Sequence, residues 1–131
     1  MVERFKAGKY YVGDPCYIFD SSWSKVLNDT DYFSGVQKIN NKKIAGCGTS
    51  YGDGTYLDNE GREYWVDSGL IAIMPVSLLK IDKKKSEKTI EKEEGMHIIN
   101  FVEDFDVECE NGLYRFGHIT INTQEEMSDG Q

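Results

Sequence analysis

The chain has 131 residues, a formal net charge of −8 and a pI near 4.7. This length fits one hydrophobic core, because single domains commonly form at about 100 to 150 residues. The acidity disfavours non-specific nucleic-acid binding, which needs a cationic surface to displace counterions from the phosphates. We therefore expect one acidic domain without direct non-specific nucleic-acid binding.

Membrane insertion and secretion are not expected. The longest apolar run, GLIAIMPV, is too short to cross a bilayer, and no apolar segment follows Arg4 and Lys6 as it does in a signal peptide. The three cysteines, Cys16, Cys47 and Cys109, lack the spacing of a zinc site or a disulfide framework. The sequence thus predicts a cytoplasmic protein with reduced thiols, no cofactor and no metal.

In the first half of the chain, short runs of β-branched and aromatic residues alternate with Gly, Asn and Asp, which is typical of antiparallel β structure. Strands are predicted at 9–12 and 16–19, on either side of the Gly13-Asp14-Pro15 turn. A short helix at 20–29 is predicted to begin at a serine N-cap. A buried strand is then expected at 42–50.

The middle of the chain repeats the Gly-Asp theme in the stretch SYGDGTYLDNEGREYWVDSG, at 50–69. A hairpin is predicted at 55–66, with Gly61 in the left-handed conformation, and a core strand follows at 67–74. Pro75 suits the first turn of a brief helix at 75–79. The charged stretch 80–95 has little to bury and is predicted to be an exposed loop or short exposed helix.

The most informative segment is 105–122, because Asn111-Gly112 favours a type I′ hairpin turn. This turn pairs Glu110 with Leu113, Cys109 with Tyr114, Glu108 with Arg115 and Val107 with Phe116. One face then carries Phe105, Val107, Cys109, Tyr114, Phe116 and His118. Continued along the second strand, the pattern places Ile119 and Ile121 on the opposite face, with Arg115.

Apolar residues on both faces of that hairpin indicate that both faces are covered. The predicted fold is therefore mainly β (α+β), a compact antiparallel β barrel or sandwich with one or two short helices. Its single β-rich domain spans 1–123, with the exposed charged loop at 80–95. Residues 124–131 lack core side chains and are predicted to form a flexible acidic tail.

The candidate nucleophiles and bases have structural interpretations beside the catalytic ones. His97 and His118 suggest paired His-x-Thr motifs, but only His118 is followed by the matching Thr120, and a core or edge histidine is favoured. Cys16 lies beside the Gly-Asp-Pro turn without an adjacent base. A buried, unreactive thiol is the favoured interpretation there, and close backbone packing explains Cys47 between two glycines.

The acidic residues of the two Gly-Asp stretches do not have the spacing of an EF-hand loop, and turn formation accounts for many of them. Turn formation does not account for the tyrosines and the arginine beside them, which are typical of a surface that stacks on a ligand or anchors a protein. The two stretches are predicted to share one surface. The Gly13-Asp14-Pro15 turn is predicted to form its rim, because Gly13 can adopt a backbone conformation closed to other residues and Pro15 fixes φ, so that the Asp14 carboxylate is held in one orientation. The candidate ligand- or partner-binding residues are Asp14, Cys16, Tyr51, Asp53, Tyr56, Arg62 and Asp67.

Three motifs, G-D-P-C-Y at 13–17, Y-G-D-G-x-Y at 51–56 and D-S-G at 67–69, carry a family resemblance. Together with the stretch ending FDVECENGLYRFGHITINT, the chain resembles a group of small uncharacterised proteins of bacteria, prophages and phages. The resemblance covers 10–123 apart from the charged loop. It implies a mobile-element context rather than a mechanism, and such proteins often occupy a host protein or trap a small molecule.

Two function classes follow. The preferred hypothesis is a small acidic non-catalytic binding protein of phage or prophage type. It would engage a host protein, or sequester a small and nucleotide-like ligand, through the Gly-Asp loops. The alternative is a small hydrolase that acts on a phosphorylated or amide substrate with Asp14, Asp53 or Asp67 as general base.

Overall fold

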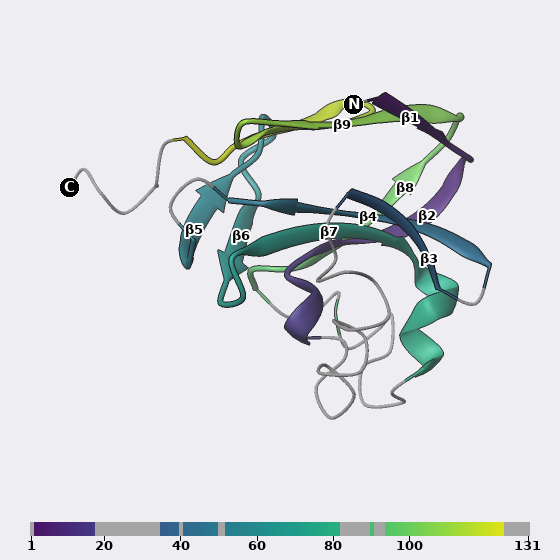
Figure 1. Ribbon diagram of the computed structural model, residues 1–131, viewed down its shortest axis with the longest axis horizontal. Coiled ribbons are helices and arrows are strands. Elements are labelled where there is room, and N and C mark those ends of the chain that lie inside the picture. The colour runs from purple at the N-terminus through teal and green to yellow at the C-terminus, as the bar shows by residue number, and fades with distance from the viewer. Residues whose placement is uncertain are drawn as a thin grey trace.

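The computed structural model describes residues 2–17, 35–39, 41–49, 52–81, 90 and 94–124. Within these ranges the chain forms two antiparallel sheets that lie face to face, with a separate hairpin at one side (Figure 1). The sheets do not close into a barrel, so the predicted mainly β fold is confirmed in its sandwich form. Among the described residues, no helix is long and apolar enough to span a bilayer.

The four-stranded sheet has the order β1-β9-β10-β11 and the five-stranded sheet the order β3-β4-β7-β2-β8. The first contains β1 (Val2–Phe5), β9 (Phe105–Glu110), β10 (Leu113–Phe116) and β11 (Ile119–Asn122). The second contains β2 (Gly8–Gly13), β3 (Gly35–Ile39), β4 (Lys42–Gly48), β7 (Leu70–Pro75) and β8 (His97–Phe101). The separate hairpin pairs β5 (Gly54–Leu57) with β6 (Glu63–Val66).

The main core fills the space between the two sheets. Aromatic side chains dominate one part of it, where Phe101 stacks on Phe105 at 4.0 Å between ring centroids and Tyr10 meets Phe105 edge-on at 5.2 Å. The β5–β6 hairpin adds Tyr56 and Tyr64, both fully buried. Alternation along the hairpin strands directs these tyrosines into the core and leaves Leu57 and Trp65 partly exposed.

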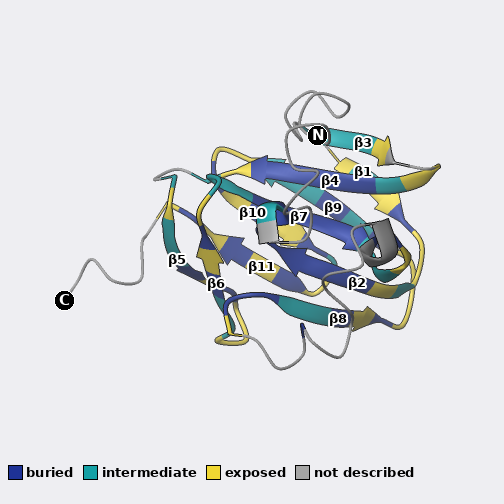
Figure 2. Cartoon of the chain, turned by 90° about the horizontal axis from the view of Figure 1, so that it is seen from below, coloured by how far each residue is buried: buried dark blue, intermediate teal, exposed yellow. Residues whose placement is uncertain are grey.

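A second core lies on the other face of the five-stranded sheet. It contains Tyr11, Ile44, Ala72 and Met74 from the strands, and Leu78 from the 3₁₀ helix η3 (Val76–Ile81). In Figure 1 η3 lies below this sheet, on the side away from the four-stranded sheet. The two covered faces explain the nearly continuous apolar runs of β2 and β7. Figure 2 accordingly shows β2 and β4 dark blue over most of their length.

The Asn111-Gly112 hairpin is confirmed in register, with all four predicted pairs present between β9 and β10. Both turn residues have positive φ, 53° for Asn111 and 82° for Gly112, as a type I′ turn requires. Glu108 and Arg115 face each other on the outer face and form an ion pair. The predicted buried strand at 42–50 and the hairpin at 55–66 are also found, as β4 and as β5 with β6.

The continuation of that hairpin was predicted wrongly. The chain turns again at Gly117-His118, where Gly117 has φ 59°, so β10 and β11 are two strands with Phe116 opposite Ile119. This second turn returns Ile119 and Ile121 to the core face, where both are buried. His118 lies in the turn with about half of its side chain exposed, not on the apolar face.

Two other predictions differ from the structure. Residues 15–17 form the 3₁₀ helix η1 (Pro15–Tyr17) where a second strand was predicted, because the carboxylate of Asp14 binds the Cys16 N–H. Cys47 and Cys109 are joined by a disulfide, so the prediction of three reduced thiols is wrong for these two. The two cysteines are 62 positions apart in the sequence, so no local pattern indicates the pairing, and only the packing of the two sheets brings them together. The predicted helix at 20–29 lies outside the described residues.

Candidate functional site

The two Gly-Asp stretches meet at one end of the sandwich through the side chain of Asp14. Its Oδ2 accepts hydrogen bonds from the backbone N–H groups of Asp67 and Ser68, both at 2.7 Å. Its Oδ1 accepts from the Ser68 hydroxyl at 2.7 Å and from the Cys16 N–H at 2.9 Å. One carboxylate therefore joins the turn after β2 to the turn before β7.

The backbone on either side of Asp14 is equally constrained. The Tyr11 hydroxyl donates to the carbonyl oxygen of Asp14 at 2.6 Å. A Cβ at position 13 would lie 2.8 Å from that hydroxyl oxygen, so Gly13 is needed for space beside Tyr11. This differs from the sequence-based interpretation, which attributed Gly13 to an unusual backbone conformation, because its φ is not among the positive values.

The loop before β5 joins the same end of the molecule. The Thr49 hydroxyl donates to the Gly52 carbonyl at 2.6 Å, and the Thr49 N–H donates to the Gly69 carbonyl at 3.0 Å. The Tyr56 hydroxyl reaches the Gly52 carbonyl at 3.0 Å. We call this region, residues 13–16, 49, 52–53 and 67–69, the turn end. It brings together the two Gly-Asp stretches that were predicted to share a surface.

The individual side chains of the turn end are distributed differently from the prediction. Asp53 and Asp67 are exposed and Cys16 is partly buried, whereas Asp14 has no exposed surface and Tyr56 is buried in the core. The hypothesis that Asp14 presents its carboxylate at a rim does not agree with this burial, because four internal hydrogen bonds occupy both oxygens. Tyr51 lies outside the described residues.

Arg62 lies at the opposite end of the β5–β6 hairpin, beside a second buried carboxylate. Asp58 Oδ1 accepts from the N–H groups of Glu60 and Arg62, and Oδ2 accepts from the Tyr64 hydroxyl at 2.7 Å. The Arg62 guanidinium lies 3.3 Å from Asp58 and 2.9 Å from Glu60. Arg62 is thus separated from the turn end by the length of the hairpin and orders the hairpin tip.

The same contacts shift two pKa values at the tip. Burial alone would raise the pKa of Asp58, but the hydrogen bonds from Tyr64, from the two backbone N–H groups and from Arg62 outweigh it, and the pKa is lowered. Burial, together with the hydrogen bond to Asp58, raises the pKa of Tyr64. The carboxylate therefore stays ionised and the phenol stays protonated at neutral pH.

The hairpin tip is fastened to the edge of the four-stranded sheet. Asn59 donates its backbone N–H to the Thr120 carbonyl at 2.9 Å and accepts the Thr120 N–H on its side-chain oxygen at 2.9 Å. The Asn59 side-chain N–H group reaches the His118 carbonyl at 3.0 Å, and Asp58 forms a β-bridge with Ile121. The end of β5 is therefore fixed as a wall beside β11.

A groove of about 600 Å³ lies between this wall and the outer face of the four-stranded sheet. Two half-exposed leucines line it, Leu57 from β5 and Leu113 from β10. Its charged side chains are Asp58, Glu108, Glu110 and Arg115, and its amide and hydroxyl side chains are Asn59, Asn111, Thr120, Asn122 and Gln124. Alternation along β9, β10 and β11 places most of these on the outer face, opposite the core residues.

The sequence-based list of site residues contains none of the groove side chains. The sequence did contain part of the information needed to find the groove. The hairpin register already placed Glu108 and Arg115 together on the face away from Val107 and Phe116. The register says nothing about β5, which lies more than fifty positions earlier in the chain and supplies the wall. The register alone therefore gives no reason to place Leu113 in a binding site.

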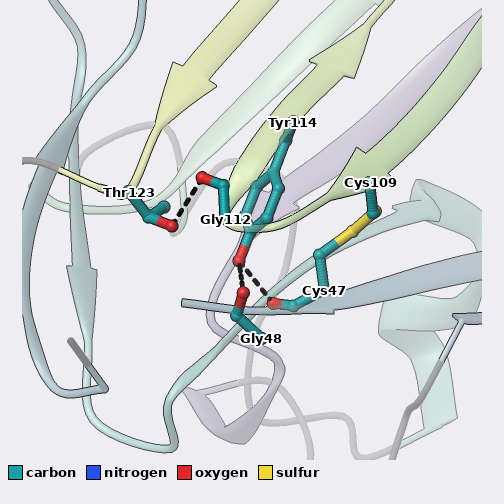
Figure 3. Close-up of a disulfide and its surroundings, with 6 residues drawn as sticks. All are labelled: Cys47, Gly48, Cys109, Gly112, Tyr114 and Thr123. Carbon is teal, nitrogen blue, oxygen red and sulfur yellow. Dashed lines mark hydrogen bonds between the residues drawn. A yellow bond between two sulfur atoms is a disulfide. The ribbon is translucent and has the colours of Figure 1, made fainter. Parts of the chain in front are cut away.

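The disulfide and Tyr114 connect the groove to the turn end. Figure 3 shows Tyr114 reaching from β10 toward β4, where its hydroxyl donates to the carbonyls of Cys47 and Gly48. Cys109 lies directly opposite Tyr114 in the β9–β10 register, and its disulfide ends on the same Cys47. Thr49, two residues beyond Cys47, belongs to the turn end. The disulfide and the hydrogen bonds of Tyr114 therefore both link the strands of the groove to β4, which leads into the turn end.

Neither histidine lines the groove or belongs to the turn end. His97 Nε2 is 2.7 Å from the Glu63 carbonyl, and burial lowers the pKa of its imidazole. His118 Nε2 is 3.8 Å from Glu60, in an exposed turn beside a smaller hollow of about 330 Å³. Over the described part of the chain, no three His, Cys, Asp or Glu side chains are grouped so that they could hold a metal ion.

No family model, curated protein or solved structure matches this chain.

Proposed function

We propose that the chain is a non-catalytic binding protein that takes its ligand or a partner segment into the groove beside β5. The observation that carries this proposal is the groove itself. Its volume of about 600 Å³ lies within the range of about 300 to 1,000 Å³ typical of ligand sites. Its leucines offer apolar contact, and its amides and hydroxyls can both donate and accept hydrogen bonds.

The contacts of Asp14 favour binding over the alternative, hydrolysis with an Asp base. A general base must reach the proton it removes, and both oxygens of Asp14 already accept two hydrogen bonds each in a buried site. Asp53 and Asp67, exposed at the turn end, are the remaining candidates for that role. Because Asp53 and Asp67 stay open as bases, the experiment described below measures the formation of hydrolysis products as well as binding.

We further propose, from the three sequence motifs alone, a phage or prophage context in which the chain engages a host component, either a protein or a small, nucleotide-like molecule. The net charge of −8 keeps the surface acidic, which disfavours polyanionic partners. The exposed carboxylates of the turn end extend the area that a protein partner could contact beyond the groove.

The test is to incubate the purified protein with a mixture of metabolites and nucleotides, isolate the complex, and release bound compounds by heat. Recovery of an intact compound supports binding, whereas new products support the hydrolase. The groove variant Leu113→Arg should lose the compound, because a long cationic side chain would project from a half-exposed position in the groove.

Two controls locate the site. Val102→Arg introduces the same charge at a residue that is 83% exposed and lies outside the groove, and it should bind normally. If Leu113→Arg binds normally but the double variant Asp53→Asn, Asp67→Asn does not, the ligand lies at the turn end and the groove proposal is wrong.

A further inference from the structure

The charges of the groove differ in how they are compensated. Three carboxylates and one guanidinium line it. Arg115 forms an ion pair with Glu108, and Asp58 is buried against Arg62. Glu110, exposed at the end of β9, makes no ion pair with any described residue. The groove therefore carries excess negative charge beside its two leucines.

The uncharged polar groups suit the backbone of an extended chain. The side-chain amide of Asn111 has no hydrogen-bond partner among the described residues, and Asn122 uses its side-chain oxygen for the Gln124 N–H, at 2.9 Å. Each amide offers both a donor and an acceptor, as each peptide group of a bound segment does. Neutral amides of this kind fix a peptide without selecting its charge.

From these observations we infer that the occupant of the groove is an extended, cationic peptide segment of a partner protein, with apolar side chains that contact Leu57 and Leu113. Lysine or arginine side chains of the segment would lie beside Glu110, the groove carboxylate that no described cation pairs with, and this charge complementarity favours a basic partner over an acidic one. The inference rests on the proposed binding function and specifies its partner.

Three labelled heptapeptides provide the test by fluorescence anisotropy: Gly-Lys-Leu-Lys-Leu-Lys-Gly and the matched peptides with Gln or Glu in place of Lys. The Lys peptide should bind most tightly and the Glu peptide should not bind. Glu110→Gln should weaken binding of the Lys peptide about fivefold, as expected for one partly exposed charge pair, and Leu113→Arg should weaken it at least about tenfold.

Glu103→Gln is the matched control, because it removes the same charge from an exposed residue outside the groove. Equal weakening by Glu103→Gln and Glu110→Gln would mean general attraction to an acidic protein and would overturn the inference. If the Lys peptide does not bind but a metabolite is retained in a Leu113-dependent manner, the cationic-peptide inference is wrong and the proposed function stands. If nothing binds in the groove, both are wrong.

Discussion

The turn end and the groove contain the same kinds of residue but use them in opposite ways. At the turn end, Asp14 is fully buried and its four hydrogen bonds are all internal. In the groove, Glu110 and the Asn111 amide face solvent without a described partner. A buried carboxylate that is saturated from within stabilises the fold, whereas exposed polar groups beside apolar side chains remain available to a ligand. Substitutions should therefore affect stability at one region and binding at the other.

The largest effect is expected from breaking the support that the two regions share. The double variant Cys47→Ala, Cys109→Ala removes a crosslink between residues that are 62 positions apart in the sequence. Loop-closure entropy then predicts a loss of about 4 kcal/mol in the free energy of unfolding. Urea denaturation of the variant and of the wild type, with and without reductant, measures the loss. A wild type that is insensitive to reductant would show that the disulfide does not contribute in solution.

Asp14→Ala should destabilise the protein by about 3 kcal/mol, because it leaves three partly buried N–H groups of the turn end without their acceptor. Asp14→Asn should also destabilise, since its NH₂ group would face N–H donors on one side where Asp14 now presents an acceptor oxygen. Urea denaturation monitored by tryptophan fluorescence measures both. An Asn variant as stable as the wild type would show that the carboxylate is not needed to join the two turns.

At the hairpin tip, Tyr64→Phe should destabilise by about 1 kcal/mol, since it removes the donor to Asp58 Oδ2 and leaves the ring in the core. Thermal unfolding is the measurement. The variant should also lose stability at higher pH than the wild type on acidification. Because the pKa of Asp58 is lowered in the folded protein, its ionised carboxylate stabilises the fold at pH values above the ordinary pKa, near 3.8. This stabilisation is lost as the pH falls through the lowered pKa.

A smaller effect is expected from His97. Because burial lowers its pKa below the ordinary value of 6.5, the unfolded chain binds the proton more readily, and stability should decrease as pH falls below about 6.5. His97→Gln retains a donor for the Glu63 carbonyl and cannot titrate. The midpoint of thermal unfolding, recorded between pH 7.5 and pH 5 in steps of about half a unit, should fall less in the variant. If the unfolding midpoint falls equally with pH in the variant and in the wild type, His97 is not the group that destabilises the protein on acidification.

The smallest effect on stability is expected in the groove, where Leu113→Arg and Glu110→Gln should change the free energy of unfolding by no more than about 0.5 kcal/mol. Both side chains are exposed and lie on the outer face of the sheet. Urea denaturation checks this, with Asp14→Ala as the destabilised reference. A large loss of stability in either groove variant would remove the contrast between the two regions.

Local signals along the chain were enough to predict the elements that depend only on neighbouring residues. The Asn111-Gly112 turn set the register of β9 and β10 because only two positive φ values in succession close that hairpin. The same local reasoning failed at Gly117-His118, where a glycine inside an apparently continuous strand marks a second turn. One missed turn reversed the assignment of Ile119 and Ile121, since side chains alternate with a period of two.

Which distant side chains come into contact depends on the packing of the two sheets and the β5–β6 hairpin. The pairing of Cys47 with Cys109, the burial of Asp14 against Asp67 and Ser68, and the wall that β5 forms beside β11 all join segments more than fifty residues apart. A sequence pattern reports the periodicity of one segment, but contacts of this kind depend on how two sheets and a hairpin pack. For that reason an aspartate predicted at a rim became an internal support, and two leucines without any motif became the lining of the groove.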